Sequence, residues 1–495
     1  MATPTLLDAL NDVRVFRGLF PVETWRPWRA FIAAVYGLPL EGEALDTFRT
    51  CTGCQEPPPA PAREVWAICG RRAGKSRIAS LLAVWTAVRT DWTKHLAAGE
   101  VATVAVIAQD MDAARTCLRY IAGILDAVPM LRRRIVQRRK TSIELEGRVV
   151  IEVRAASFKA TRSYTYAAVL CDEVAFWSDD SSACPDTEVL HALRPGLATL
   201  PGSLLVAISS PYSRRGALWE AYRRYYGQGD GDTLVWKAAS RTMNATVPEA
   251  VITEALERDE SAARAEWFAE FRSDLEAFVS ADVLAACTVS SRHELPPRSD
   301  MSYCGFVDPS GGSADSFTMA VAHLEGDVAV LDCLRETKPP FSPDSVVQEY
   351  AALAKTYRLS LLQSDKYALG WVAESFQRQG IVLEQSAAAK SEIYGSALPL
   401  LNAHRAELLD HLRLLAQLAG LERRTARGGR DSIDHGPHQH DDVANAACGA
   451  LTLAAAQMGA ACTPQLARRG DTLDWANPDR DGLPRLPMSM RYPDW

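Results

Sequence analysis

The sequence predicts an α/β protein of several domains, and three observations point to this fold class. The chain has 495 residues, which at roughly 100–200 residues per domain predicts two to four domains. Its apolar fraction of 47% and charged fraction of 23% are ordinary for a globular protein and exclude a mostly disordered or collagen-like chain. Short apolar runs alternate with helical stretches, which is the pattern of a parallel sheet covered by helices.

The net charge and the cysteine content bear on nucleic-acid binding and on the cellular compartment of the protein. The 54 Lys and Arg against 61 Asp and Glu give a net charge of −7, which argues against a histone-like coat on nucleic acid but not against local basic patches. The 11 cysteines are odd in number and no signal peptide opens the chain, so we expect a reducing cytoplasm. Cys51 and Cys54 form one isolated CxxC, for which loop cysteines are a better interpretation than zinc. No segment resembles a membrane span.

Changes in composition divide the chain into five segments. Residues 1–60 form an N-terminal segment that ends in a Pro-rich connector, and 61–275 carry the strand–helix alternation. We expect a linker at 276–300, a second α/β domain at 301–460 and a flexible tail at 461–495. The runs expected to be buried parallel strands in the first domain are Val65–Cys69, Val101–Ala108, Val149–Val153, Ala167–Cys171 and Leu204–Ser209. The second domain should open with an antiparallel meander of Tyr303–Asp308, Thr318–His323 and Val328–Leu334.

A glycine-rich turn between the first strand and an apolar helix predicts a phosphate-binding loop. In Gly70–Ser76, backbone N–H groups and the helix start would cradle an anion, while Lys75 reaches the β- and γ-phosphates and Ser76 holds Mg²⁺. The usual first glycine is replaced by Cys69, so the motif deviates, and the alternative is a basic turn. The loop residues expected to bind ATP are Gly70, Arg72, Gly74, Lys75 and Ser76.

Two later strands end in residues that complete such a site. Asp172 and Glu173 follow Ala167–Cys171 at the edge of the sheet where the loop also lies. Asp172 would contact Mg²⁺ through its water shell, and Glu173 would orient the attacking water. Ser209, at the end of the next strand, is a candidate sensor of the γ-phosphate.

Phosphoryl transfer also requires positive charge near the transferred group. Arg71 and Arg72 lie inside the loop and could supply it within one subunit. Arg162 is a candidate finger that acts on the ATP of a neighbouring subunit, and its alternative is an ordinary surface charge.

A second set of acids predicts a separate metal site. Asp308 and Asp365 each end an apolar strand, Asp315 follows the first of them in a Gly-rich turn, and Asp441 and Asp442 open an Ala-rich helix. Converging carboxylates repel unless cations neutralise them, and two Mg²⁺ or Mn²⁺ ions can activate water for phosphodiester cleavage. A helix N-cap would explain Asp441 and Asp442 but not the strand-end acids.

Three histidines beside these acids invite a zinc interpretation. His435, His438 and His440 precede the Ala-rich helix, yet oxygen ligands favour Mg²⁺ or Mn²⁺, so loop histidines are the better interpretation. Glu374 can share the role of Asp365.

In this order, the motifs resemble the large terminase subunit of tailed bacteriophages over about residues 20–455. The marks are the deviant loop Cys69–Ser76, the strand end Val169–Glu173, the Ser209–Pro211 segment, the Asp308–Ser316 turn and the acids after His440. The sequence departs from the family where an adenine-contacting Gln is common, because Arg29 occupies that position.

The resemblance implies a DNA-packaging motor. An N-terminal ASCE-type P-loop ATPase would translocate double-stranded DNA into a procapsid, and a C-terminal RNase H-like nuclease would cut concatemeric DNA. The implied cofactors are ATP and Mg²⁺ or Mn²⁺ at both sites. The implied partners are duplex DNA, a small terminase subunit, the portal protein and further copies of the chain in a ring, possibly a pentamer, in the host cytoplasm. The alternative is a helicase or remodelling ATPase with a non-catalytic RNase H-like module.

Basic stretches are the candidate DNA contacts. Residues 423–430 lie just before the acid pair, and 132–140 form the densest basic run; each could instead be a solvated face. Phosphate contacts of this kind bind DNA without reading its sequence. The arginines expected to contact DNA are Arg423, Arg424, Arg427 and Arg430.

Overall fold

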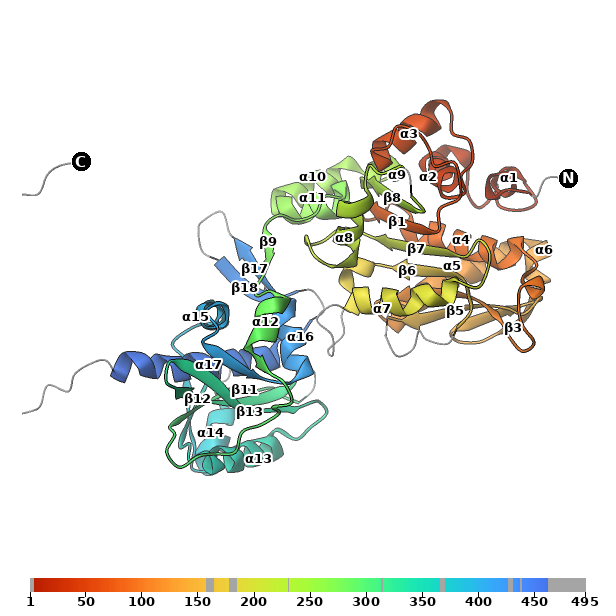
Figure 1. Ribbon diagram of the computed structural model, residues 1–495. Coiled ribbons are helices and arrows are strands. Elements are labelled where there is room, and N and C mark those ends of the chain that lie inside the picture. Colours follow the sequence, from red (N-terminus) through yellow and green to blue (C-terminus); the bar gives the residue numbers. More distant parts are fainter. Residues whose placement is uncertain are drawn as a thin grey trace, which may run out of the picture.

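A computed structural model describes residues 4–156, 164–177, 185–229, 231–312, 315–365, 370–425, 431–436 and 439–461. Within these ranges the chain forms two α/β units, each built around one large sheet (Figure 1). The predicted α/β class is therefore confirmed. The predicted tail 461–495 lies outside the described residues apart from its first residue.

The first sheet has the order β3-β4-β5-β2-β6-β7-β1-β8. All five runs predicted as strands are present at its centre, and each pairs in parallel with its neighbour. The antiparallel hairpin β3–β4 extends the edge beside β5, which the sequence did not predict. The strands are β1 (Glu64–Cys69), β2 (Ala102–Ala108), β3 (Ile135–Arg138), β4 (Ser142–Leu145), β5 (Val149–Ala155), β6 (Tyr166–Asp172), β7 (Leu204–Ser209) and β8 (Thr233–Ala238).

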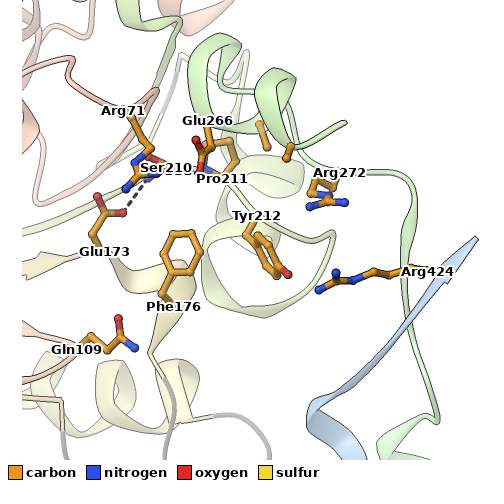
Figure 2. Close-up of a pocket in the computed structure, with 12 residues that line it drawn as sticks. Arg71, Gln109, Glu173, Phe176, Ser210, Pro211, Tyr212, Glu266, Arg272 and Arg424 are labelled. Atoms are coloured by element: carbon orange, nitrogen blue, oxygen red, sulfur yellow. Dashed lines mark hydrogen bonds and ion pairs between the residues drawn. The ribbon is translucent and has the colours of Figure 1, made fainter. Parts of the chain in front are cut away.

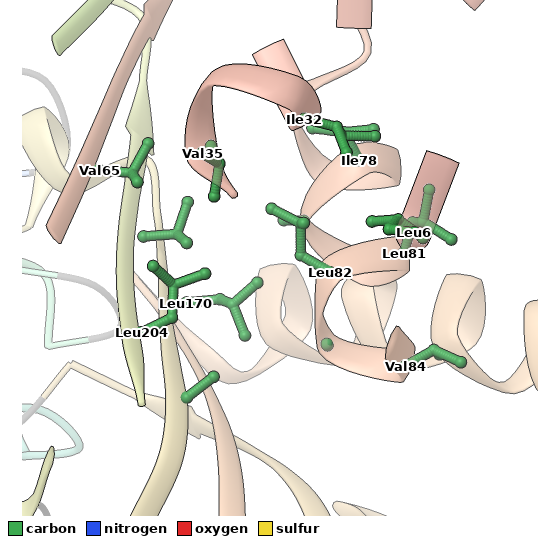
Figure 3. Close-up of a cluster of buried hydrophobic side chains, with 14 of the residues drawn as sticks. Leu6, Ile32, Val35, Val65, Ile78, Leu81, Leu82, Val84, Leu170 and Leu204 are labelled. Atoms are coloured by element: carbon green, nitrogen blue, oxygen red, sulfur yellow. The ribbon is translucent and has the colours of Figure 1, made fainter. Parts of the chain in front are cut away.

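Helices bury both faces of this sheet, which explains why its strands are continuous apolar runs. Val65 and Ala67 of β1 pack into one cluster, while Trp66 and Ile68 pack into the cluster on the opposite face. Figure 3 shows the first of these clusters between the sheet and the N-terminal helices. The helices of this unit are α1 (Leu6–Asn11), α2 (Val22–Val35), α3 (Gly42–Thr52), α4 (Lys75–Arg89), η1 (Trp92–Lys94), α5 (Met111–Ala127), α6 (Pro129–Arg132), η2 (Val174–Phe176), α7 (Pro185–Leu193), η3 (Arg194–Leu197), α8 (Gly216–Tyr225), α9 (Ser240–Met243), α10 (Glu249–Arg258) and α11 (Glu260–Phe268).

The parallel register brings three motifs to one edge of the first sheet. Ile68 of β1 lies opposite Ser209 of β7, and Asp172 of β6 lies opposite Ile208 of β7. The carboxyl ends of β1, β6 and β7 are therefore neighbours, and the segments that follow them meet in space.

The segment 276–300, predicted to be a linker, instead carries ordered elements. The side chains of Leu284 and Cys287 in α12 are buried in the core of the second unit, and β10 pairs with β16. These apolar side chains attach the segment to the second unit from α12 onward. The elements are β9 (Leu275–Ala277), α12 (Ala281–Cys287) and β10 (Thr288–Val289).

The second sheet has the order β10-β16-β13-β12-β11-β14-β15. The predicted antiparallel meander is present as β11, β12 and β13, and β14 adds in parallel beside β11. The elements of this unit are β11 (Tyr303–Asp308), β12 (Phe317–Glu325), β13 (Val328–Thr337), α13 (Pro343–Thr356), β14 (Leu361–Ser364), α14 (Trp371–Arg378), β15 (Val382–Gln385), α15 (Lys390–Asn402), β16 (Ala406–Leu409), α16 (Leu412–Gly420) and α17 (Asp442–Ala461).

A small third sheet has the order β18-β17-β9. Strands β17 (Leu421–Thr425) and β18 (Asp431–His435) form an antiparallel hairpin, and β9 pairs with β17. In Figure 1 this hairpin lies on the side of the second unit that faces the first.

The Ala-rich helix α17 packs closely on the second sheet because its contact face carries small side chains. Val443, Ala444, Ala446, Ala447 and Ala450 are fully buried against the strands and α15. A Cβ added at Gly449 would overlap the ring of Phe306 in β11. Among the described residues, no helix combines the length and hydropathy needed to cross a lipid bilayer.

Gly449→Ala should lower the thermal unfolding midpoint of the second unit, because the added methyl overpacks the Phe306 contact and costs about 1–3 kcal/mol. Gly395→Ala in α15 is the matched control. Its added Cβ meets no atom within 4 Å, so helix propensity should stabilise that variant by up to about 1 kcal/mol. Equal shifts for the two variants would contradict this packing.

Candidate functional site

Two glycines shape the predicted phosphate loop between β1 and α4. A Cβ at Gly70 would clash with Ser240 Oγ and lie 2.8 and 2.9 Å from the backbone oxygens of Trp267 and Glu266. Gly74 has φ of 102°, a conformation that disfavours other residues. The loop therefore favours glycine at both positions, at Gly70 because other segments of the chain pack closely and at Gly74 because of its backbone conformation.

Lys75, the first residue of α4, has a buried ammonium group. Its Nζ donates to Cys69 O at 2.9 Å, Gly70 O at 3.3 Å and Ser210 Oγ at 2.7 Å. Glu173 Oε1 lies 3.4 Å from the same nitrogen. The ammonium thus joins the loop to the acid pair and to the segment after β7.

Ser76 and Asp172 face one another across the cradle. Ser76 Oγ donates to Asp172 Oδ2 at 3.2 Å, and Cys117 Sγ lies 3.1 Å from the same oxygen. Burial raises the pKa of Asp172, and the charge of Glu173 raises it further. Asp172 Oδ1 is buried and has no hydrogen-bond partner among the described residues. A buried carboxylate oxygen left in this way beside a serine hydroxyl fits the predicted Mg²⁺ position.

Glu173 has a strained backbone, with φ of 50°, that directs its carboxylate toward the segment after β7. Its Oε2 accepts from Ser210 N at 3.1 Å and from Ser209 Oγ at 3.2 Å. Ser209 Oγ also accepts from Ala175 N at 3.2 Å. Ser209, the candidate sensor of the γ-phosphate, therefore contacts Glu173 directly.

The arginines of the loop lie at the rim of the site. Arg71 Nη1 donates to Glu266 Oε1 at 2.9 Å, and Arg72 is held through its backbone oxygen by Asn244 Nδ2 at 2.8 Å. Arg71, Glu173 and Ser210 line a cleft of about 420 Å³ (Figure 2). Arg71 is thus close enough to the cleft to act within the subunit, whereas Arg162 lies outside the described residues.

The second site forms where two parallel strands end. Val307 of β11 pairs with Ser364 of β14, so the next residues, Asp308 and Asp365, are neighbours. Asp308 Oδ2 accepts from Asn445 Nδ2 of α17 at 2.8 Å. Burial raises the pKa of Asp308 to about 8, with smaller contributions from the charges of Asp365 and Asp442.

The two acids that open α17 have different surroundings. Asp441 is buried, with Oδ1 2.6 Å from Lys390 Nζ and Oδ2 accepting from Tyr394 Oη at 2.8 Å. Asp442 Oδ2 accepts from Ser316 N at 3.3 Å, and its charge raises the pKa of Asp308. Asp442 therefore faces the strand-end acids, while Asp441 is fixed by Lys390 and Tyr394.

Asp315 lies at the exposed rim of this cluster. Its Oδ1 is 3.5 Å from His440 Nδ1, and its charge contributes to the raised pKa of Asp442. Glu374 is exposed on α14.

The residues described do not include three or more His, Cys, Asp or Glu side chains close enough together to hold a metal ion. The acids predicted to bind metal thus lie in one region, but within the described residues their side chains are not close enough together to form a complete set of metal ligands. Carboxylates repel one another, and here Asn445 and Lys390 each engage one of them.

The chemistry of the donors nevertheless fits a divalent cation. Asp308, Asp365 and Asp442 supply oxygen only, and Asn445 Oδ1 is a buried amide oxygen with no hydrogen-bond partner in the described part of the chain. These are the ligand types that Mg²⁺ and Mn²⁺ prefer. Asp308, Asp365 and Asp442 are the residues that would hold it.

Sequence reasoning missed several residues of both sites. Asn445 had a signal, because it is a polar residue four positions after Asp441 in an Ala-rich helix. Lys390, Tyr394 and Cys117 had none, since only the fold brings them to the acids.

The predicted DNA-binding arginines divide into two pairs. Arg423 and Arg424 lie on β17, and Arg424 also lines the cleft beside Glu173. Arg427 and Arg430 lie outside the described residues.

No family profile and no curated protein matches the sequence. Solved structures similar to the chain include the large terminase of bacteriophage HK97, which is 15% identical, covers 86% of this chain and 99% of its own, and has a TM-score of 0.39. The large terminase of a thermophilic bacteriophage is 12% identical over 79% of this chain and 94% of its own, with a TM-score of 0.36. The large terminase nuclease of thermophilic phage G20c is 19% identical, covers 35% of this chain and 96% of its own, and has a TM-score of 0.30. These structural neighbours are large terminases, and each is less than 20% identical to the chain.

The raised pKa of Asp308 predicts a pH dependence of stability in chelator. From about pH 4 to pH 8 the folded state keeps a proton that the unfolded state has lost, so stability should fall as pH rises by at most about 1.4 kcal/mol per pH unit. Asp308→Asn should remove this part of the slope, measured as the denaturant midpoint from pH 4 to 9. Parallel slopes for the two proteins would show that Asp308 titrates normally.

Proposed function

We propose that the chain is the ATPase and nuclease subunit of a phage DNA-packaging motor of the large-terminase type. The first unit would hydrolyse ATP to translocate duplex DNA into a procapsid, and the second would cut concatemeric DNA with two metal ions. The observation that carries this proposal is the meeting of Lys75, Ser76, Asp172 and Glu173 at one sheet edge, in a chain whose second sheet gathers its own strand-end acids.

For hydrolysis, each residue of the first site has a role that its position supports. The loop Gly70–Ser76 would bind the phosphates, and Lys75 would exchange its contacts with carbonyl oxygens and Ser210 for phosphate oxygens. Ser76 and Asp172 would hold Mg²⁺, which neutralises charge on the β- and γ-phosphates. Glu173 would orient the attacking water, and Arg71 would stabilise the charge that develops.

For cleavage, Asp308, Asp365 and Asp442 would hold Mg²⁺ or Mn²⁺, which supply an activated water and neutralise the phosphodiester. Asn445 keeps Asp308 in place through its 2.8 Å hydrogen bond. Lys390 and Tyr394 hold Asp441 and thereby fix the start of α17, from which Asp442 projects.

The proposed partners follow from the motor role. Duplex DNA would contact Arg423 and the basic residues around it through its phosphates. A small terminase subunit, the portal and a ring of copies, possibly five, would complete the machine in the host cytoplasm. Arg162 would then act on the neighbour's ATP.

One observation favours the alternative of a helicase-like ATPase with a non-catalytic second unit. The described acids do not form a closed metal-binding group. A module that only binds DNA needs no such group, so absence of cleavage from a folded, ATP-hydrolysing protein would support this alternative.

Lys75→Ala should abolish ATP hydrolysis, because the loop loses the buried ammonium group expected to bind the phosphates. The same variant should still cleave plasmid DNA in the presence of Mn²⁺. Phosphate release and plasmid nicking on the same preparation check this. Arg241→Ala, which removes an exposed ion pair with Glu249, is the folded control. Loss of both activities in folded Lys75→Ala would contradict two separate sites.

A further inference from the structure

Glu422 precedes Arg423 and Arg424 on β17, and its side chain is only 1% exposed. Its Oε2 accepts from Tyr212 Oη at 2.8 Å, and its Oε1 lies 2.6 Å from Arg215 Nη2. Arg424 Nη2 is farther away, at 3.8 Å. A buried carboxylate of the β17–β18 hairpin is thus compensated mainly by the first unit, and loss of a partner would leave a costly buried charge.

The residues that compensate Glu422 follow β7 directly. Tyr212 is two residues beyond Ser210, whose N–H donates to Glu173 and whose hydroxyl accepts from Lys75. Tyr212, which contacts Glu422, is therefore joined by a short stretch of chain to Ser210, which contacts both Glu173 and Lys75.

A second route joins Tyr212 to the same site. Phe176 ends η2, which begins one residue after Glu173, and its ring centroid lies 5.5 Å from that of Tyr212. Figure 2 shows Phe176 and Tyr212 side by side in the cleft, with Glu173 beyond one end and Arg424 beyond the other.

We propose that Glu422 is a positioning residue of the ATPase, which holds the segment Ser210–Arg215 so that Ser210 keeps Glu173 aligned for hydrolysis. Hydrolysis would then depend on a residue of the β17–β18 hairpin that lies outside the phosphate loop. The inference rests on the proposed function, because hydrolysis is its readout.

Glu422→Gln keeps the shape and an acceptor for Tyr212 but removes the charge that pairs with Arg215, and Tyr212→Phe removes only the hydroxyl. Each should lower kcat for ATP by about tenfold, the effect of one lost hydrogen bond to a charged group. KM for ATP and the affinity for ADP should stay within about twofold, since neither side chain lies in the phosphate cradle.

The decisive test is the double-mutant cycle of Glu422→Gln and Tyr212→Phe on full-length protein, read as steady-state ATPase. The combined loss in the double variant should be smaller than the product of the two single losses, because both changes release the same segment, one through Arg215 and the other through Tyr212. Glu407→Gln, which removes the charge that pairs with Arg292 at 2.7 Å inside the second unit, is the matched control and should retain the parental rate.

The outcomes separate the two claims. Parental rates in both single variants, or strictly additive losses, would overturn the role of Glu422 while leaving the ATPase intact. A loss in Glu407→Gln equal to that in Glu422→Gln would reveal general destabilisation and also overturn it. Folded parental protein that binds no ADP and hydrolyses no ATP would overturn the proposed function itself, and the inference with it.

Discussion

The buried ammonium of Lys75 is the interaction on which the rest of the first site depends. A charge removed from water must be compensated, and here the carbonyls of Cys69 and Gly70, the Ser210 hydroxyl and the carboxylate of Glu173 do so. These groups come from three segments that share one sheet edge. The parallel order β6-β7-β1 is therefore what makes the site possible, and the loop glycines permit the close approach.

The second site obeys a different constraint, which is repulsion among acids. Asp308 and Asp365 are forced together by strand pairing, and α17 brings Asp442 and Asn445 to them because its alanines allow a close approach to the sheet. The raised pKa values of Asp308 and Asp442 have the same origin in burial and in neighbouring acids. In the proposed function, a cation would replace the proton that Asp308 keeps in this site.

Much of this could be predicted from the sequence, because it depends on local pattern. The buried strands are apolar runs, the phosphate loop is a local motif, and Asp172, Asp308 and Asp442 stand at element ends. The roles of Lys390, Tyr394 and Glu422 could not be predicted, since their partners lie 51, 47 and 210 residues away along the chain. The segment 276–300, which we expected to be a linker, carries the short helix α12, whose burial depends on apolar side chains distant along the chain.

The central claim is that one chain carries two separate phosphate-directed metal sites. Mn²⁺ binding to full-length protein, counted by electron paramagnetic resonance with and without ADP, tests it most directly. The account predicts one class of ions that depends on ADP and is lost in Asp172→Asn, and another that is independent of ADP and is lost in Asp308→Asn. An unchanged number of bound ions in folded Asp308→Asn would contradict it.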